Sequence, residues 1–357
     1  MSKAEYKRLD DYIREVNIRN RELKVTNLLG VSISKEFMPS IANTIGTDMS
    51  TYKIVERGQF AYGPVTSRNG DKVSIALLDG YDDAIISQAY TVFEVIDHEQ
   101  LLPEYLMMWF RRPEFDRYAR FHSHGSAREI FDWDELCDVM LPIPSITRQR
   151  EIVAEYETLT NRIRLNNQMI QHLEATAQAL YRKTFVDNID KENLPEGWRM
   201  GTLGEIADIK NGKAILPAEG NNPVYGGNGI VGYTNSSNAE NVVVIGRVGI
   251  NCGSLYLHQS KCYVNDNAMI AIPKSGNTIF LYRTMKEIDL NSQSEGSGQP
   301  LLTQSIIYKQ ECLIPKLEQR IKFEEQMEIV YKQKSLKEKE NSKLTELQSL
   351  LLAKMGQ

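Results

Sequence analysis

Apolar residues recur every seven positions through the middle of the chain. One row holds Tyr156, Ile163, Ile170 and Ala177, and the position three residues further on holds Leu159, Asn166, Leu173 and Leu180, with Ile152 one heptad earlier. A heptad of this kind is typical of a coiled-coil seam, in which Asn166 is the one polar interruption. Because neither Gly nor Pro occurs between Ser145 and Leu194, the pattern predicts an unbroken helix. At ~1.5 Å rise per residue, about 40 residues make a rod on the order of 60 Å long.

A second stretch without helix breakers follows Pro315, where Gly356 is the only Gly or Pro. Its apolar pattern is poorer: Val330, Leu344 and Leu351 share a register, with Leu347 beside them. Either helix alone is also compatible with an ordinary amphipathic helix lying on its own domain. Two helices of similar length favour an antiparallel pair that buries both seams, with Asn166 setting their register.

The segments before the two helices have a different composition. Of the 23 glycines, 15 lie between Pro195 and Pro315, mixed with Asn, Ser, Val, Ile and Tyr. Such a mixture is typical of short strands joined by tight turns. The chain therefore divides into a mixed block (1–144), a long helix with its linker (145–194), a second mixed block (195–315) and a second long helix (316–357).

The two halves repeat one plan. At a separation of 171 residues, Ser126-Ala127-Arg128 aligns with Ser297-Gly298-Gln299, and Ile143-Pro144 aligns with Ile314-Pro315. With one residue fewer in the second copy, Gln149-Arg150 then aligns with Gln319-Arg320. The segments Leu9–Ile13 and Leu203–Ala207 open the two blocks in a similar way. An internal repeat of this length predicts an α+β fold with two similar domains, joined by two long antiparallel coiled-coil helices in a pseudo-twofold arrangement.

Composition and charge limit the function classes. Hydrophobic residues make up 41% of the chain and charged residues 25%, which is ordinary for a globular protein. No apolar run approaches the roughly 18 residues of a membrane helix, and the N-terminus lacks the apolar core of a signal peptide, so we expect a cytoplasmic protein. Its four cysteines show no CxxC spacing and are expected to be buried thiols. The net charge of −5 argues against strong nonspecific nucleic-acid binding by the chain alone.

A set of ordered motifs resembles a known family. They are Leu194-Pro195-Glu196-Gly197-Trp198, Leu203-Gly204-Glu205-Ile206, Asn211-Gly212-Lys213, Tyr225-Gly226-Gly227-Asn228-Gly229-Ile230-Val231-Gly232-Tyr233, Val244-Ile245-Gly246-Arg247-Val248-Gly249, Gly296-Ser297-Gly298-Gln299-Pro300 and the repeated Ile-Pro before Gln-Arg. Each is weak alone, but their order, together with the block-helix repeat, resembles the specificity subunit of type I restriction-modification systems. The resemblance covers essentially the whole chain.

The resemblance implies that the two blocks are target-recognition domains, each reading one half of a bipartite site in double-stranded DNA. The helices would act as a spacer and as a docking surface for two modification (methyltransferase) subunits and for restriction (translocase and nuclease) subunits. It implies a non-catalytic chain without a cofactor of its own, with S-adenosylmethionine, ATP and Mg²⁺ on the partner subunits. The first block lacks the Tyr225–Tyr233 type of segment, so we expect the two blocks to recognise different bases.

The first block carries a local basic patch. Five arginines stand against Glu114 and Asp116 between Trp109 and Arg128, although the block as a whole has 17 basic and 23 acidic residues. Long cations and amides on loops are the side chains that contact phosphates and base edges. Four neighbouring residues, Tyr105, Leu106, Trp109 and Phe110, are better explained as the core face of a helix. The alternative for the arginines is that they form the solvated face of that helix. The DNA-binding candidates are Ser67, Arg68, Asn69, Lys72, Arg111, Arg112, Arg117, Arg120, His122, His124, Ser126 and Arg128.

The second block offers amides and cations on glycine-rich loops. Its candidates are Lys210, Asn211, Lys213, Tyr225, Asn228, Arg247, Asn251, Lys261, Asn265, Asn267 and Gln299. The alternative for each asparagine is that it merely satisfies a turn position with positive φ. In the same way, Asn69-Gly70 predicts a hairpin turn whose residues need have no other role.

Enzyme motifs in the sequence are incomplete. Asn222-Pro223-Val224-Tyr225 resembles the Asn-Pro-Pro-Tyr motif of adenine methyltransferases but lacks the second proline and a Gly-rich cofactor-binding turn. Cys252, His258 and Cys262 do not have the spacing of a usual zinc site, and no Gly-Lys-Ser/Thr follows the Gly226–Gly229 run. His122-Ser123-His124 shows no nucleophile and base arrangement.

These patterns lead to one hypothesis and one rival. The hypothesis is a sequence-specific DNA-binding subunit without catalytic activity. The rival is a coiled-coil adaptor whose two heads bind protein and do not contact DNA. A self-sufficient methyltransferase would bind S-adenosylmethionine as an isolated chain, which we do not expect.

Overall fold

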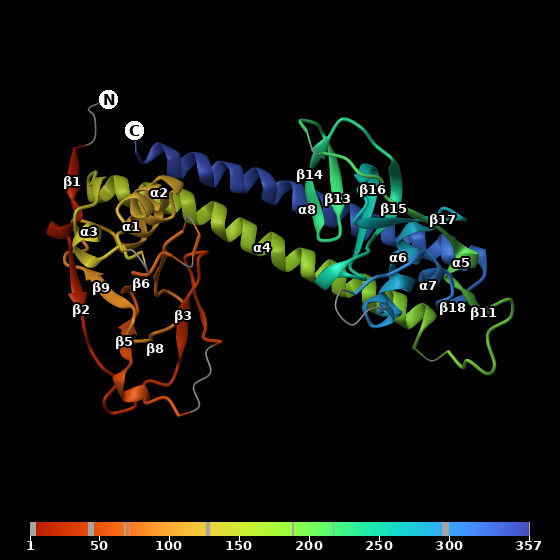
Figure 1. The fold of residues 1–357 in the computed structure, drawn as a ribbon, viewed down its shortest axis with the longest axis horizontal. Helices are drawn as coiled ribbons and strands as arrows, with labels where there is room; N and C mark the ends of the chain where they lie inside the picture. The colour runs from red at the N-terminus through yellow and green to blue at the C-terminus, as the bar shows by residue number, and fades with distance from the viewer. Residues whose placement is uncertain are drawn as a thin grey trace. The chain divides into compact units, whose positions relative to one another are not determined.

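The computed structural model describes residues 5–41, 46–67, 69–70, 72–125, 129–187, 189–216, 218–294 and 300–356 (Figure 1). The chain forms two compact units. The first comprises the chain up to Leu165 together with its end from Glu340, and the second comprises Asn166–Lys339. Two long helices, α4 (Ile146–Phe185) and α8 (Leu317–Lys354), contribute one half to each unit. The compact units therefore differ from the blocks expected from the sequence, because each block folds together with half of both helices.

The first unit is built from short strands and short helices. A four-stranded antiparallel sheet has the order β2-β9-β6-β7, and three two-stranded ladders pair β1 with β10, β3 with β4 and β5 with β8. The strands are β1 (Tyr6–Arg8), β2 (Ile13–Val16), β3 (Leu29–Val31), β4 (Phe37–Pro39), β5 (Lys53–Glu56), β6 (Phe60–Gly63), β7 (Ser74–Leu77), β8 (Asp83–Ile86), β9 (Thr91–Val95) and β10 (Met140–Pro142). The helices are α1 (Pro103–Phe110), α2 (Pro113–Phe121) and α3 (Trp133–Cys137), with 3₁₀ turns at Leu9–Asp11 and Met49–Thr51.

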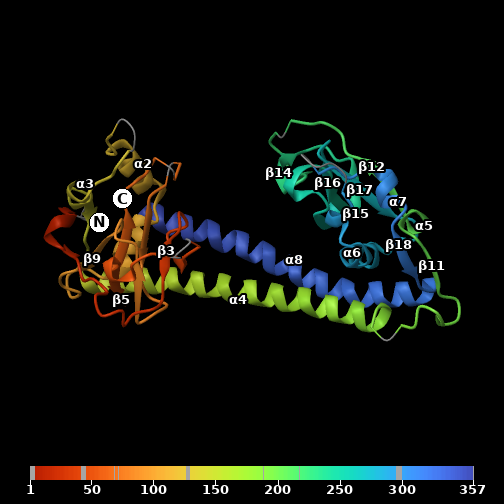
Figure 2. The same ribbon diagram turned by 60° about the horizontal axis from the view of Figure 1, so that its bottom comes forward.

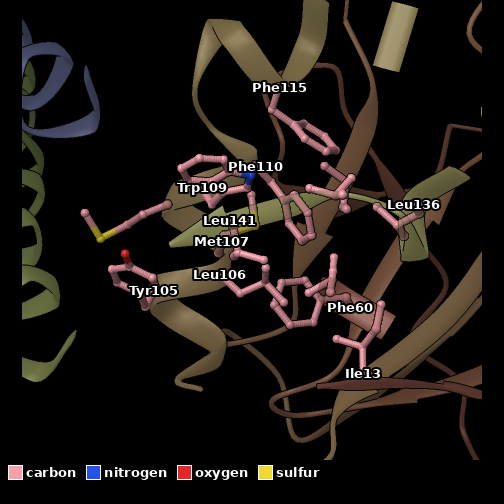
Figure 3. Packing of buried hydrophobic residues seen from close by; sticks show 14 of the residues in the cluster. Ile13, Phe60, Tyr105, Leu106, Met107, Trp109, Phe110, Phe115, Leu136 and Leu141 are labelled. Atoms are coloured by element: carbon pink, nitrogen blue, oxygen red, sulfur yellow. The ribbon is translucent and has the colours of Figure 1, made fainter. Parts of the chain in front are cut away.

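Local sequence explains where these helices begin. Both α1 and α2 start with a proline, whose fixed φ and missing N–H suit the first helical position. The side chain of Asp132 accepts a hydrogen bond from the backbone N–H of Glu135 and so caps α3. The main core of the unit lies between the four-stranded sheet and α1, where the rings of Phe60 and Phe110 pack together (Figure 3). The ring of Phe93 stacks on that of Phe60.

The second unit is organised around one larger sheet. Six strands have the order β12-β17-β15-β16-β13-β14, and a separate ladder pairs β11 with β18. All pairs are antiparallel except β13 with β16. The strands are β11 (Arg199–Thr202), β12 (Ala207–Asn211), β13 (Asn222–Gly226), β14 (Gly229–Thr234), β15 (Ala239–Gly246), β16 (Leu255–Val264), β17 (Ala268–Pro273) and β18 (Glu311–Ile314). The helices are α5 (Leu203–Ile206), α6 (Thr278–Glu287) and α7 (Gln304–Tyr308), with 3₁₀ turns at Gly249–Asn251 and Leu290–Gln293.

Helix α6 is the central element of the second unit's core. Nearly all of its residues are buried, and it contacts β15, β16 and β17 on one side. On the other side it packs against the parts of α4 and α8 that belong to this unit, through Tyr181, Phe185 and Phe323 (Figure 2). A helix buried on all sides needs apolar residues all round, which is what Ile279, Phe280 and Leu281 provide in sequence.

The internal repeat is visible in the order of elements. Each block begins with a strand that pairs with the last strand before the long helix, β1 with β10 and β11 with β18. The first of these last strands ends just before its Ile-Pro dipeptide, and the second ends at the isoleucine of its own. A short helical segment follows the first strand in both copies, and a short helix, α3 or α7, precedes the last strand. The copies differ in between, where two small ladders (β3 with β4 and β5 with β8) and a four-stranded sheet in the first unit take the place of the six-stranded sheet in the second. The predicted α+β class with two mixed units and two long paired helices is confirmed.

Within each unit, α4 and α8 run antiparallel. In the first unit, Arg162 Nε lies 2.6 Å from Glu340 Oε1, and Val153 and Tyr156 share a core with Leu352 and Met355. In the second unit, Glu174 Oε2 lies 3.0 Å from Lys334 Nζ. Antiparallel pairing allows both seams to be buried, as the heptad predicted.

The seam departs from the predicted register at two positions. Leu180 is 38% exposed and Leu347 is 48% exposed, whereas Tyr181 and Leu352 are buried. An undistorted helix has 3.6 residues per turn, so a strict seven-residue row drifts around its surface over several turns. Here the aromatic side chains of the domain core fix the buried face: the Tyr181 hydroxyl lies 3.0 Å from Thr284 Oγ1 on α6. Of the predicted seam residues, Tyr156 and Asn166 are buried, and Leu180 and Leu347 are on the outer surface. The others are partly buried: Ile152, Leu159, Ile163, Ile170, Leu173, Val330, Leu344 and Leu351.

Residues from the long helices also cap shorter helices. In the first unit, the fully buried amide of Gln149 accepts a hydrogen bond from the N–H of Leu102, just before α1, at 2.9 Å. It donates to the carbonyls of Gln100 and Pro144 at 2.8 and 2.9 Å. In the second unit, the carboxylate of Glu324 accepts from the N–H groups of Ile279 and Phe280 at the start of α6, at 2.8 and 2.9 Å. These bonds satisfy backbone donors that a helix N-terminus otherwise leaves open.

We expect Gln149→Ala to lower the free energy of unfolding of the first unit by about 3 kcal/mol, because it removes three buried hydrogen bonds and leaves their partners unsatisfied. Gln319, the equivalent residue of the repeat, is exposed. The matched variant Gln319→Ala should therefore change stability by less than about 0.5 kcal/mol. Urea denaturation of the full chain measures both, and equal effects of the two variants would contradict the capping role.

Candidate nucleic-acid interface

In the first unit, two groups of candidate residues from separate parts of the sequence come together. The connection between β6 and β7 carries Ser67, Asn69 and Lys72, and α2 carries Arg117 and Arg120. The backbone of Thr66 donates to the carbonyl of Glu129 at 3.0 Å. The side-chain carboxylate of Asp116 accepts from the N–H of Val73 at 3.1 Å. We call Lys72, Arg117, Arg120, Phe121, His122 and His124 the α2 surface.

Asp116 fixes the position of the connecting loop on α2. Its carboxylate also lies 2.7 Å from Nζ of Lys35, a side chain that is only 5% exposed. Burial lowers the pKa of Lys35, and the hydrogen bond and charge of Asp116 oppose that shift. Because both its bonds point into the unit, Asp116 adds little uncompensated negative charge to the α2 surface.

The arginines and histidines of the α2 surface lie beside neighbouring carboxylates. Arg117 lies 3.0 Å from Glu114, and Arg120 pairs with Glu129. His122 Nδ1 lies 2.9 Å from one oxygen of Glu135, and His124 Nε2 lies 3.4 Å from the other. The arginine pairs are exposed and therefore weak, so a phosphate can replace their partners at little cost.

Two candidates of this region have other roles. Arg112 is 7% exposed, stacks on Trp109 with its guanidinium carbon 4.1 Å from the ring centroid, and lies against Gly356 at the end of α8. Arg111 lies over the Tyr156 ring of α4 at 5.8 Å. The sequence offered both arginines as DNA-binding candidates, but they follow the last turn of α1 and turn back onto the aromatic core. The structure therefore places Arg112 in the core, not on the recognition surface.

The predicted hairpin at Asn69-Gly70 connects β6 and β7, which pair as expected. The connection runs from Gly63 to Ser74 and is longer than a two-residue turn. The Asn69 amide donates to the Val65 carbonyl and to Ser74 Oγ at 3.2 and 3.1 Å. Asn69 therefore stabilises the loop, and its amide is already committed to protein partners.

In the second unit, four loops meet at one end of the large sheet. They are Asn211–Lys213, Gly226–Gly229, Gly246–Asn251 and Asn265–Asn267, and we call them the second-unit loop cluster. Backbone hydrogen bonds join them: Lys213 N–H to Val264 O and Asn265 N–H to Tyr225 O at 3.0 and 2.8 Å. Arg247 N–H donates to Asn267 O at 3.1 Å. Four stretches that are distant in sequence thus form one surface.

Two glycines make this approach possible. A Cβ at Gly212 would lie 1.9 Å from the carbonyl oxygen of Asn265, and a Cβ at Gly246 would lie 2.4 Å from that of Asn251. No other residue fits at such distances. The glycines that the sequence assigned to tight turns therefore also hold the loops in contact.

The loop cluster presents cations and amides together. Lys210, Asn211, Lys213, Asn228 and Asn267 are exposed, and Asn251 and Arg247 are partly exposed. The Nε atom of Arg247 is buried and has no hydrogen-bond partner among the residues that the structure describes. Asn265 differs, because its side-chain oxygen accepts from the Asn267 N–H at 2.9 Å and shapes the turn. Cations and amides on loops fixed by a sheet are suited to contacting phosphates and base edges.

Tyr225 and Lys261 are placed differently. Tyr225 is 7% exposed, and its hydroxyl lies 3.1 Å from Nδ1 of His258. Burial raises the pKa of Tyr225 to about 12 and lowers that of His258. Lys261 is exposed on β16, outside the loop cluster, and lies opposite Glu240 in the ladder with β15. Tyr225 is thus part of the sheet's packing.

Four further candidates, Arg68, Ser126, Arg128 and Gln299, lie outside the described residues. One residue that the sequence did not single out is Phe121, at the end of α2, which is 82% exposed. At about 100° per residue, Phe121 lies well away from the buried Phe115 and Ala119 on this helix. Helical periodicity could therefore have shown from the sequence that Phe121 faces away from the core.

The chemistry of metals and thiols is limited in the described part of the chain. No group of three or more His, Cys, Asp or Glu residues there is arranged to hold a metal ion. Cys137, Cys252, Cys262 and Cys312 are buried free thiols, as predicted. Among the described residues, no helix is both long enough and apolar enough to cross a bilayer.

Comparison with known proteins identifies the second block. Residues 195–349 match the family model of the type I restriction modification DNA specificity domain. The chain is 27% identical over 137 residues to the type I restriction enzyme HindI specificity subunit of Haemophilus influenzae. That match covers 38% of this chain and 29% of the relative, so less than a third of that protein is represented.

The fold of the whole chain is also known. The crystal structure of the S subunit of a type I restriction-modification system from M. genitalium superposes with a TM-score of 0.67 at 16% sequence identity. The superposition covers 100% of this chain and 97% of that one. At this identity the match establishes the fold. Together, these findings confirm the resemblance that the ordered motifs indicated.

The second unit should lose stability as the pH falls. The unfolded chain binds a proton at His258 with a pKa near 6.5, whereas burial holds the folded ring neutral to lower pH. The unfolded state therefore takes up more protons below about pH 6.5, and stability present above that pH is lost as the pH decreases. We expect His258→Gln to reduce this loss in urea titrations between pH 7.5 and 5. The exposed His172→Gln should leave it unchanged, and an unaltered profile in His258→Gln would contradict the assignment.

Proposed function

We propose that this protein selects the DNA sequence for a type I restriction-modification complex. Residues 195–349 match the family model of the specificity domain, and the chain shares its fold with a specificity subunit. Each unit reads one half of a bipartite site in double-stranded DNA. The observation that carries the proposal is the presence, in each unit, of loop-borne cations and amides held in place by a sheet or helix. The α2 surface serves one half-site and the second-unit loop cluster serves the other.

The two interfaces differ in construction, which supports an asymmetric target. The first combines arginines and histidines of α2 with one loop. The second combines asparagines with Lys210, Lys213 and Arg247 on glycine-bent loops. Amides pair with the edge of adenine and arginine pairs with that of guanine in the major groove. Different side-chain sets therefore favour different bases in the two half-sites.

Partner subunits complete the proposed complex. The chain carries a net charge of −5, so a large part of the phosphate neutralisation has to come from other chains. The long helices present apolar residues for docking, with Leu165 and Met169 on α4 and Ile329 and Leu336 on α8 each at least 49% exposed. We propose two methyltransferase subunits and restriction subunits as partners. These bring S-adenosylmethionine, ATP and Mg²⁺, while this chain performs no bond-making step.

Exchange of one recognition block tests the proposal directly. Residues 1–144 are replaced by the corresponding block of a relative, and the chimera is produced with its partner subunits in cells that lack other methyltransferases. We expect methylation-sensitive sequencing of the genome to show one half of the methylated motif changed and the other half retained. An unchanged motif would favour the adaptor hypothesis, in which the heads bind protein without contacting DNA.

A single substitution in the second-unit loop cluster should affect one half-site. We expect Asn267→Ala to reduce discrimination at one or two base pairs of the second half-site by about tenfold, since a good amide–base pair contributes ~1–3 kcal/mol. The first half-site should be read as before. Lys261→Ala, in the same unit but outside the cluster, is the control. Competition binding of the assembled complex to duplexes with single base-pair changes measures both, and loss of discrimination in the control alone would refute the placement.

A further inference from the structure

Phe121 is an apolar side chain in an unusual setting. Its ring is 82% exposed, whereas Phe115 on the same helix is 3% exposed. Leaving such a ring in water forgoes the free energy that its burial would contribute. A single exposed hydrophobic residue is common on protein surfaces, so the ring is informative only in combination with what surrounds it.

The ring borders a hollow whose charged lining is mainly basic. The hollow is lined by Lys72, Pro113, Asp116, Arg117, Arg120 and Phe121. Three of these residues are cations, and the carboxylate of the single acid, Asp116, is held by Lys35 and by the Val73 N–H. The hollow therefore joins one apolar ring to three cations, facing a carboxylate whose charge is already compensated.

The carboxylates around the hollow do not cancel this basic character. Glu114 pairs with Arg117, and its side chain is 48% exposed; Glu129 pairs with Arg120, and its side chain is 37% exposed. Ion pairs with this exposure contribute little to stability. A phosphate, which accepts bidentate hydrogen bonds from arginine, competes well with such partners.

We propose that Phe121 is a base-contacting residue of the first half-site. Its ring packs against the apolar surface of a base in the duplex, while Lys72, Arg117 and Arg120 contact the phosphates on either side. The inference rests on the proposed DNA-reading function and adds to it a specificity-determining residue. A ring surrounded by cations matches DNA, in which apolar base surface lies within a groove bordered by phosphates.

Two kinds of apolar base surface fit the ring. One is the 5-methyl group of a thymine at the floor of the major groove, against which phenylalanine packs. The other is the face of a base at a partly unstacked step, into which an apolar side chain inserts. Both place the ring against a base, and substituted duplexes tell them apart.

The test uses the full complex with its methyltransferase subunits and the target that methylation sequencing of the genome defines. Phe121→Ala and Phe121→Leu are compared with wild type. The control is Ile96→Ala, which removes another exposed apolar side chain of the first unit, 49% exposed. Because Phe121 is exposed, we expect its variants to keep the thermal unfolding midpoint of the wild type.

We expect Phe121→Ala to weaken binding to the cognate duplex by about 5- to 100-fold, the range that corresponds to the usual worth of a base contact. Phe121→Leu should retain part of that affinity, and binding to unrelated duplexes should change much less. With a thymine contact, replacing one thymine of the first half-site by deoxyuridine weakens wild-type binding and leaves Phe121→Ala unaffected. With insertion, 2-aminopurine at one step brightens with wild type and not with the variant.

Several results would overturn the inference. Equal losses of affinity for cognate and unrelated duplexes would reduce Phe121 to a general contact. Wild-type affinity and discrimination in Phe121→Ala would remove it from the interface. Impaired assembly with normal discrimination by the complexes that do form would assign the ring to a protein partner. A wild-type complex without any sequence preference would instead refute the proposed function itself.

Discussion

The structure depends on the burial of one face of each half of α4 and α8 in the core of a mixed domain. A pair of helices about 40 residues long has a limited seam of its own, and here Asn166 and several partly buried residues interrupt it. The strong contacts are aromatic and come from the domains: Tyr156 in the first unit, and Tyr181, Phe185 and Phe323 in the second. Helices gain most of their stability from such tertiary packing. The blocks in turn complete their cores only with the helices.

Much of the fold follows from patterns that have one physical meaning. The absence of Gly and Pro over long stretches leaves little alternative to continuous helices. Each Ile-Pro dipeptide lies at the junction between the last strand of its block and the long helix that follows. The ladder between β1 and β10, and that between β11 and β18, explain why these motifs recur. The buried residues of each long helix were harder to predict, because a heptad pattern considers one helix without the domain that packs against it. Tyr181 is buried because α6 lies beside it, and α6 is more than 90 residues away in sequence.

The candidate interface shows a similar division. The sequence identified cations and amides on loops, and the structure assembles many of them into the α2 surface and the second-unit loop cluster. The sequence could not distinguish Arg112, which stacks on Trp109, from Arg117, which is exposed, because both are arginines in a basic run. Composition also could not show that the side chains of Asn69 and Asn265 form hydrogen bonds within their own loops. The sequence did not single out Phe121, because an aromatic residue close to other aromatic residues is usually assumed to be buried.

The amide of Gln149 has an implication for how such proteins diversify. It belongs to the long helix, yet it satisfies backbone groups at the entrance to α1 and at Pro144, all within the preceding block. A block received from another protein by recombination has to present the same three backbone atoms to this side chain, or leave a fully buried amide unpaired. In the second half, Glu324, which lies further along its long helix, accepts the corresponding hydrogen bonds at the start of α6. Blocks from the first and second positions are therefore not freely interchangeable, and a chain that acquires a new block is expected to keep each block with its own kind of helix.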